Sequence, residues 1–178
     1  FAGKDNSKTV WIMAHTDIVP PGDLSKWQGD PYTLRVEGDR IYGRGVEDNQ
    51  HGLVAGVMAG KALVDTGIKP KYNVGLIFVA DEEVGSKFGI DYVLEHHKIF
   101  GKDDLIIVPD SGDPEGKTIE IAEKSICWLK IETTGKQCHG SRPDQGINAF
   151  AAASKLAAKV HALYNIFDYK DSLFEPAY

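Results

Sequence analysis

Residues 9–14 read TVWIMA, a short apolar run that ends at His15. Two further runs, VGLIFVA at residues 74–80 and LIIV at residues 105–108, have the same character. All three are rich in β-forming residues and apolar on both faces, which is typical of strands buried in the middle of a sheet that helices cover. The three runs therefore predict the centre of a β-sheet.

Helical patterns separate these runs. Residues 50–66, QHGLVAGVMAGKALVDT, are mostly small and apolar and precede Gly67, a residue type that commonly ends helices. Residues 88–97, FGIDYVLEHH, are a second helical candidate. Strands that alternate with helices indicate an α/β domain with a mainly parallel central sheet.

The pattern changes after the third strand. Residues 118–122 and 126–133 have the composition of strands, and the second of these runs alternates between apolar and polar side chains. A helix rich in alanine is predicted at residues 149–164. We therefore expect one domain over residues 1–123 and the start of an α+β domain over residues 124–178.

The bulk composition narrows the class of protein. The chain has 178 residues and a formal net charge of −6, without a basic stripe of the kind that binds nucleic acid or anionic lipid. No apolar run reaches the roughly 18–20 residues of a membrane-spanning helix. Cys127 and Cys138 do not form a CxxC pair, and we expect two reduced thiols. The composition favours a cytoplasmic protein with neither a nucleic-acid nor a membrane partner.

Acidic and imidazole side chains follow each predicted strand. His15 and Asp17 follow the first, residues 81–83 (DEE) the second, and Asp110 the third. The carboxyl ends of parallel strands meet at one edge of the sheet, where open α/β sheets bind ligands. Carboxylates gathered there would repel one another unless a cation or a shared proton offset their charge. One such residue alone would be a turn or capping residue, but three strand ends together predict a site.

A further acid precedes the first predicted helix. The stretch GRGVED at residues 43–48 places Asp48 just before that helix, where by itself it could be an N-cap. Imidazole and carboxylate ligands without a thiolate suit zinc, with cobalt or manganese as substitutes. Such a set favours a catalytic ion that keeps a bound water over a structural zinc.

Five motifs, in order along the chain, resemble those of the M20 metallopeptidase family. They are HTDIVP at 15–20, GRGVED at 43–48, DEEVGS at 81–86, Asp110, and HGSRP at 139–143. The family includes dipeptidases, carboxypeptidases and deacylases of acyl amino acids, among them succinyl-diaminopimelate desuccinylase and acetylornithine deacetylase. The resemblance implies part of a zinc-peptidase-like catalytic domain, followed by the start of an α+β lid and dimerisation domain.

The resemblance also implies the ligands of two divalent metal ions. Asp48 would bridge both ions, His15 and Asp110 would bind one of them, and Glu83 would bind the other. Asp17 would not be a ligand but would hold the imidazole ring of His15.

Further roles follow from the same resemblance. Glu82 would be the general base, and His139 of the lid would donate a hydrogen bond to the oxyanion in the active site of a partner subunit. The peptide bond between Asp48 and Asn49 would be cis. Within one chain, His139 would lie far from the metal ligands. The family's last metal-binding histidine lies beyond this chain, and its opening helix and strand precede it, so we expect an incomplete and inactive part of a homodimeric enzyme.

The function predicted is hydrolysis of an amide bond in a dipeptide or other small peptide, through a water bound by two metal ions. Aspartate rather than glutamate at position 110 resembles the aminopeptidase and dipeptidase branches. Removal of the acyl group from an N-acyl amino acid is the alternative. A non-catalytic binding module is a third possibility, against which the intact Glu82 argues.

Overall fold

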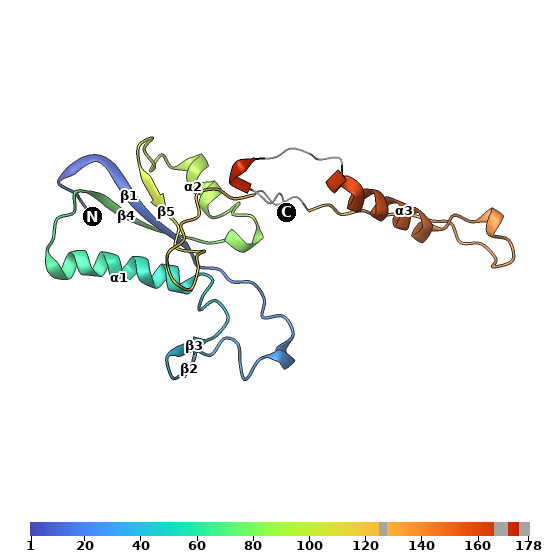
Figure 1. Ribbon diagram of the computed structural model, residues 1–178, viewed down its shortest axis with the longest axis horizontal. Helices are drawn as coiled ribbons and strands as arrows, with labels where there is room; N and C mark the ends of the chain where they lie inside the picture. The colour runs from blue at the N-terminus through green and yellow to red at the C-terminus, as the bar shows by residue number, and fades with distance from the viewer. Residues whose placement is uncertain (125–127, 166–170, 175–178) are drawn as a thin grey trace. The chain divides into compact units, whose positions relative to one another are not determined.

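The computed structural model describes residues 1–124, 128–165 and 171–174 of the chain (Figure 1). The chain divides into two compact units, Phe1–Ile119 and Glu120–Tyr178, and each is described by itself.

A three-stranded parallel sheet forms the centre of the first unit, in the order β4-β1-β5. These strands are β1 (Asp5–His15), β4 (Tyr72–Val79) and β5 (Leu105–Ile107). Within β1, Val10 pairs with Val74 on one side and with Leu105 on the other. The strand that ends at His15 is therefore the central one. This parallel sheet confirms the predicted α/β class.

Helix α1 (Gln50–Thr66) connects β1 to β4 and lies along the sheet (Figure 1). Its buried residues are Gly52, Gly56 and Gly60. A Cβ atom at Gly56 would lie 3.2 Å from Ile12 Cγ2 of β1, so the small residues let the helix backbone approach the strand closely. The helix ends at Gly67 with a φ of 64°, as the sequence predicts.

Shorter elements complete the first unit. Helix α2 (Ile90–His96) is shorter than the predicted span of residues 88–97. An antiparallel hairpin of β2 (Arg35–Glu37) and β3 (Arg40–Tyr42) was not predicted. Single turns of 3₁₀-helix occur at η1 (Leu24–Lys26) and η2 (Glu82–Val84).

In the second unit the predicted helix forms. Helix α3 (Ala149–His161) begins after Asn148, whose side chain accepts a hydrogen bond from the Ala151 amide, and it continues as the 3₁₀ turn η4 (Ala162–Asn165). The turns η3 (Pro143–Gln145) and η5 (Ser172–Phe174) also belong to this unit.

Residues 118–122 are not a strand, which corrects the prediction. Of the second predicted strand, residues 126 and 127 lie outside the described residues, and residues 128–133 form no strand. Ile119 and Trp128 are 85% and 91% exposed, so alternation here is not accompanied by burial. A strand needs a neighbour to pair with its backbone, and the β-pairing described in this unit is the single bridge between Lys136 and Ile147. Within the described parts of the chain, every helix is too short or too polar to cross a lipid bilayer.

Candidate metal centre

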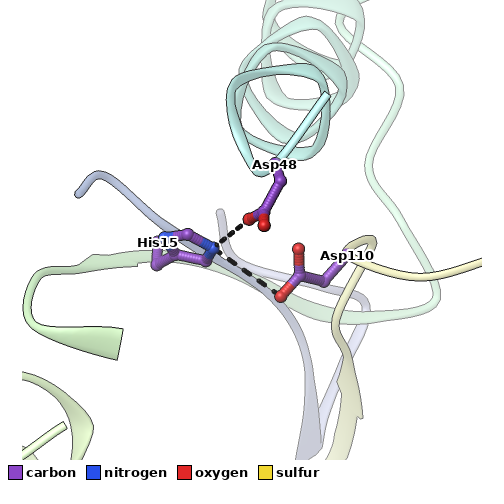
Figure 2. Close-up of side chains that lie close together, drawn as sticks. All are labelled: His15, Asp48 and Asp110. Carbon is purple, nitrogen blue, oxygen red and sulfur yellow. Dashed lines mark hydrogen bonds and ion pairs between the residues drawn. The ribbon is translucent and has the colours of Figure 1, made fainter. Parts of the chain in front are cut away.

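His15, Asp48 and Asp110 meet at the carboxyl edge of the sheet (Figure 2). One ligand atom from each lies within 4.8 Å of the others. His15 Nε2 is 2.8 Å from Asp48 Oδ1 and 3.8 Å from Asp110 Oδ2. The three residues come from the end of β1, the approach to α1 and the loop after β5, so the sheet topology brings them together. The peptide bond between Asp48 and Asn49 is cis, which confirms that expectation.

The ring of His15 is held with one nitrogen facing the cluster. His15 is 3% exposed, and its Nδ1 lies 3.0 Å from the carbonyl oxygen of Asp17 and 3.3 Å from Asp17 Oδ1. Because a carbonyl oxygen can only accept, Nδ1 is the donor in this contact. The ring therefore presents Nε2 to Asp48 and Asp110, the orientation that a metal-binding histidine needs.

Burial and neighbouring charges shift the pKa values of His15 and Asp110. Burial lowers the pKa of His15, but the hydrogen bond with Asp48 and the negative charge of Asp110 outweigh it and raise the pKa above the ordinary value. Burial raises the pKa of Asp110, the charge of His15 lowers it and the charge of Asp48 raises it, with a net increase. Two carboxylates beside one imidazole thus carry more negative charge than the protein offsets, which fits a divalent cation.

Asp17 connects the cluster to the end of β4. Its carboxylate accepts hydrogen bonds from the backbone amides of Glu82 (3.2 Å) and Glu83 (3.1 Å). Burial alone would raise the pKa of Asp17, but the amides of Glu83 and Glu82 stabilise the charged form and the pKa is lowered. The same residue therefore orients His15 and the turn η2 that carries both glutamates.

Glu82 and Glu83 occupy different surroundings. Burial raises the pKa of the Glu82 carboxyl; the charge of His15 lowers it and that of Asp110 raises it, and the net shift is upward. Glu83 Oε1 is buried and has no hydrogen-bond partner among the described residues. Glu83 is not part of the described His15–Asp48–Asp110 cluster, so its role as a ligand stays a prediction.

The turn after β4 also depends on Asp81, whose importance sequence reasoning missed. Asp81 has a φ of 70°, its carbonyl oxygen accepts from Ser86 N (2.6 Å), and its Oδ2 accepts from Phe88 N (2.9 Å). This left-handed residue is the N-cap of η2, the 3₁₀ turn that begins at Glu82. No periodic pattern in the sequence signals such a conformation. The sequence shows only that residue 81 is an aspartate, a residue type that tolerates a left-handed backbone.

His139 lies in the second unit, in the loop before η3. Its Nδ1 accepts a hydrogen bond from the backbone amide of Ser141 (3.2 Å) and lies 2.9 Å from Ser141 Oγ. An amide nitrogen only donates, so Nδ1 of the neutral ring carries no proton and Nε2 does. His139 therefore offers an N–H donor at Nε2, although its relation to the metal cluster stays a prediction.

Comparisons with known proteins point to one family. The family model described as peptidase family M20/M25/M40 matches residues 11–171. An uncharacterised metallohydrolase of Methanocaldococcus jannaschii is 48% identical over 99% of this chain and 43% of its own length. A succinyl-diaminopimelate desuccinylase of Wolinella succinogenes is 32% identical over 94% of this chain and 45% of its own. The chain spans less than half the length of these curated relatives.

A solved structure is also similar. It is an M20 family metallo-carboxypeptidase from Sulfolobus solfataricus, 33% identical, with a TM-score of 0.54. The match covers 64% of this chain and 26% of that protein.

Proposed function

The chain belongs to peptidase family M20/M25/M40, and on that basis we propose that its protein hydrolyses the amide bond of a dipeptide or other small peptide with the help of two divalent metal ions. The observation that carries this proposal is the convergence of His15, Asp48 and Asp110 ligand atoms within 4.8 Å at the carboxyl edge of the sheet. Imidazole and carboxylate donors suit zinc first, and cobalt or manganese as substitutes.

We propose one set of ligands for each of the two ions. Asp48 would bridge them, with His15 and Asp110 on one ion and Glu83 on the other. The buried, unpaired Oε1 of Glu83 supports this role, because a buried carboxylate oxygen without a partner is costly unless something binds it. When bound, such ions lower the pKa of a shared water and polarise the scissile carbonyl.

Glu82 is proposed as the general base. Desolvation raises the pKa of its partly exposed carboxyl, and it adjoins Glu83 on the turn that Asp17 anchors. It would take a proton from the attacking water and pass it to the leaving amine. Separate duties for the two neighbouring glutamates are consistent with their different surroundings.

His139 is proposed to act across a subunit boundary. Its Nε2–H donor suits the negative oxygen that develops on the scissile carbonyl. We propose that the second unit is the start of a lid that forms a homodimer, and that His139 of one subunit completes the active site of the other. A cytoplasmic location likewise remains a prediction.

Deacylation of an N-acyl amino acid is the second candidate, and the similarity to desuccinylases favours it. The two reactions break the same kind of bond, so the catalytic residues do not separate them. The intact acids of η2 argue against a non-catalytic module.

The test is a matched substrate panel with the intact protein. Dipeptides and the N-succinyl and N-acetyl forms of the same amino acids would be offered with added zinc, cobalt or manganese. The proposal expects hydrolysis that a chelator abolishes and metal restores, with faster turnover of dipeptides. Faster turnover of the acyl amino acids would favour the deacylase. Two bound ions without hydrolysis of either class would support a binding module.

A further inference from the structure

Asn49 is the most completely buried large side chain described in this chain, with an exposed fraction of 0%. Neither Oδ1 nor Nδ2 of its amide has a hydrogen-bond partner among the described residues. Buried polar groups in folded proteins are nearly always hydrogen-bonded, so an amide with both ends unpaired requires an explanation. The metal ligands and proton carriers discussed above do not use it.

The surroundings of the amide supply a partner. A Cβ atom placed on Gly52 would lie 2.1 Å from Asn49 Oδ1 and 2.2 Å from the carbonyl oxygen of Pro109. Both oxygens therefore lie on the side of Gly52 toward which a Cβ atom would project. Two acceptors that lie close together repel, whereas an amide turned by half a revolution exchanges Oδ1 for Nδ2 with almost no change in shape. In that orientation Nδ2, a donor, would lie on the same side of Gly52 as the Pro109 carbonyl oxygen, an acceptor.

The position of this contact gives it a role. Asn49 follows Asp48 directly, and Pro109 directly precedes Asp110. These two carboxylates come from different elements and share the cluster with His15. We propose that Asn49 is a positioning residue whose Nδ2 donates a hydrogen bond to the Pro109 carbonyl oxygen and so holds the Asp48 and Asp110 segments at a fixed separation. This inference rests on the proposed metal site.

Gly52 leaves the space in which this hydrogen bond would form. A side chain there would displace the Asn49 amide and the Pro109 backbone together, because each lies closer than real Cβ contacts allow. Gly56, one turn further along α1, is also buried, but its nearest neighbours are side-chain atoms of Ile12 and Phe78. The two variants, Gly52→Ala and Gly56→Ala, thus compare the same substitution in the same helix with and without contact with Asn49 and Pro109.

The bond itself can be tested without metal. In the intact, metal-free protein with isotope-labelled asparagine, the Asn49 side-chain NH₂ signal is identified by its loss in Asn49→Asp. We expect these protons to exchange with solvent much more slowly than those of the other asparagines, and a through-bond coupling to the Pro109 carbonyl. A protected NH₂ without that coupling, or rapid exchange, would overturn the inference.

The positioning role is tested by metal affinity. Asn49→Asp keeps the shape but loses the donor, and we expect it to weaken zinc or cobalt binding about 10–100-fold, the usual effect of removing an outer partner of metal ligands. Gly52→Ala should do the same, whereas Gly56→Ala should keep wild-type affinity. If Asn49→Asp and Gly52→Ala both fold and bind metal with wild-type affinity, the positioning role is refuted. A wild-type protein that binds no metal would instead refute the proposed function and leave the amide measurement to decide.

Discussion

At the scale of single residues, His15 is the centre of the proposed site. It is buried, its Nδ1 is committed to Asp17, and its Nε2 faces two carboxylates. A proton and a metal ion would compete for the same nitrogen, because a metal binds the neutral ring. This competition makes metal affinity and the stability of the metal-free protein respond to pH in opposite directions.

The pH prediction follows from the raised pKa of His15. A folded-state pKa above the unfolded value of about 6.5 stabilises the metal-free protein below that pH, and the contribution is lost as pH rises through the folded-state pKa. Zinc affinity should instead rise in the same window, by about tenfold per pH unit for each displaced proton. Unfolding of the metal-free protein and calorimetric zinc titrations between pH 5 and 9 (roughly the range in which histidines titrate) would measure both. Parallel changes would contradict the assignment.

The neighbouring glutamates allow a matched pair of variants. Glu82→Gln should keep both metal ions and lower kcat by about 10²–10⁴-fold, because only the proton acceptor is lost. Glu83→Gln should lose affinity for one ion. Turnover and bound metal per chain are the two measurements, made on the intact protein. Normal kcat in Glu82→Gln would mean that another group is the base.

At the scale of elements, Asp17 joins the end of β1 to the turn after β4. Replacement by Ala removes an acceptor from two backbone amides and the carboxylate beside His15. We expect a loss of about 1–3 kcal/mol in the free energy of unfolding and of about 10–100-fold in metal affinity. Denaturant unfolding and metal titration would check the two effects.

Asp23 provides the control for Asp17. Its carboxylate also accepts from a backbone amide and from a hydroxyl, both of Ser25, but in the exposed turn η1. Asp23→Ala should leave metal affinity unchanged. If Asp17→Ala bound metal as tightly as Asp23→Ala does, Asp17 would stabilise the turn η2 but would not orient His15 for metal binding.

At the scale of the whole molecule, the prediction concerns the sharing of an active site between subunits. His139→Ala and Glu82→Gln should each be nearly inactive in the intact protein. In a mixture that has exchanged subunits, one of the two sites in each heterodimer would carry both native residues. Activity should then recover to an appreciable fraction of the wild-type value. Recovery would not occur if His139 served its own subunit, provided that exchange is verified with tagged chains.

Burial in the first unit is concentrated near the proposed site. Its most buried residues include Ala14, His15, Asn49 and Val79, with exposed fractions of 1%, 3%, 0% and 8%. The apolar residues of β5, by contrast, are about half exposed, with values of 51–53%. Close packing at the carboxyl ends of β1 and β4 fixes the ligand-bearing segments, which favours a preformed site.

That Asp48 joins His15 and Asp110 was implied by the family resemblance. The sequence alone determined the central strands, helix α1 and the meeting of His15 and Asp110 at one edge of the sheet. These features depend on local apolar periodicity and on the rule that parallel strands end at one edge, and neither needs coordinates. Composition misled at residues 118–122, because β-forming residues do not ensure that a neighbouring strand is available to pair.

Only the tertiary structure decided how the site is held. The two amides that donate to Asp17, the left-handed backbone of Asp81 and the buried amide of Asn49 arise from contacts between segments far apart in the chain or from single dihedral angles. A residue type states which hydrogen bonds are possible, but rotamer and packing select among them. The sequence therefore identified the chemical groups of the site, and the fold determined which of them meet and in which orientation.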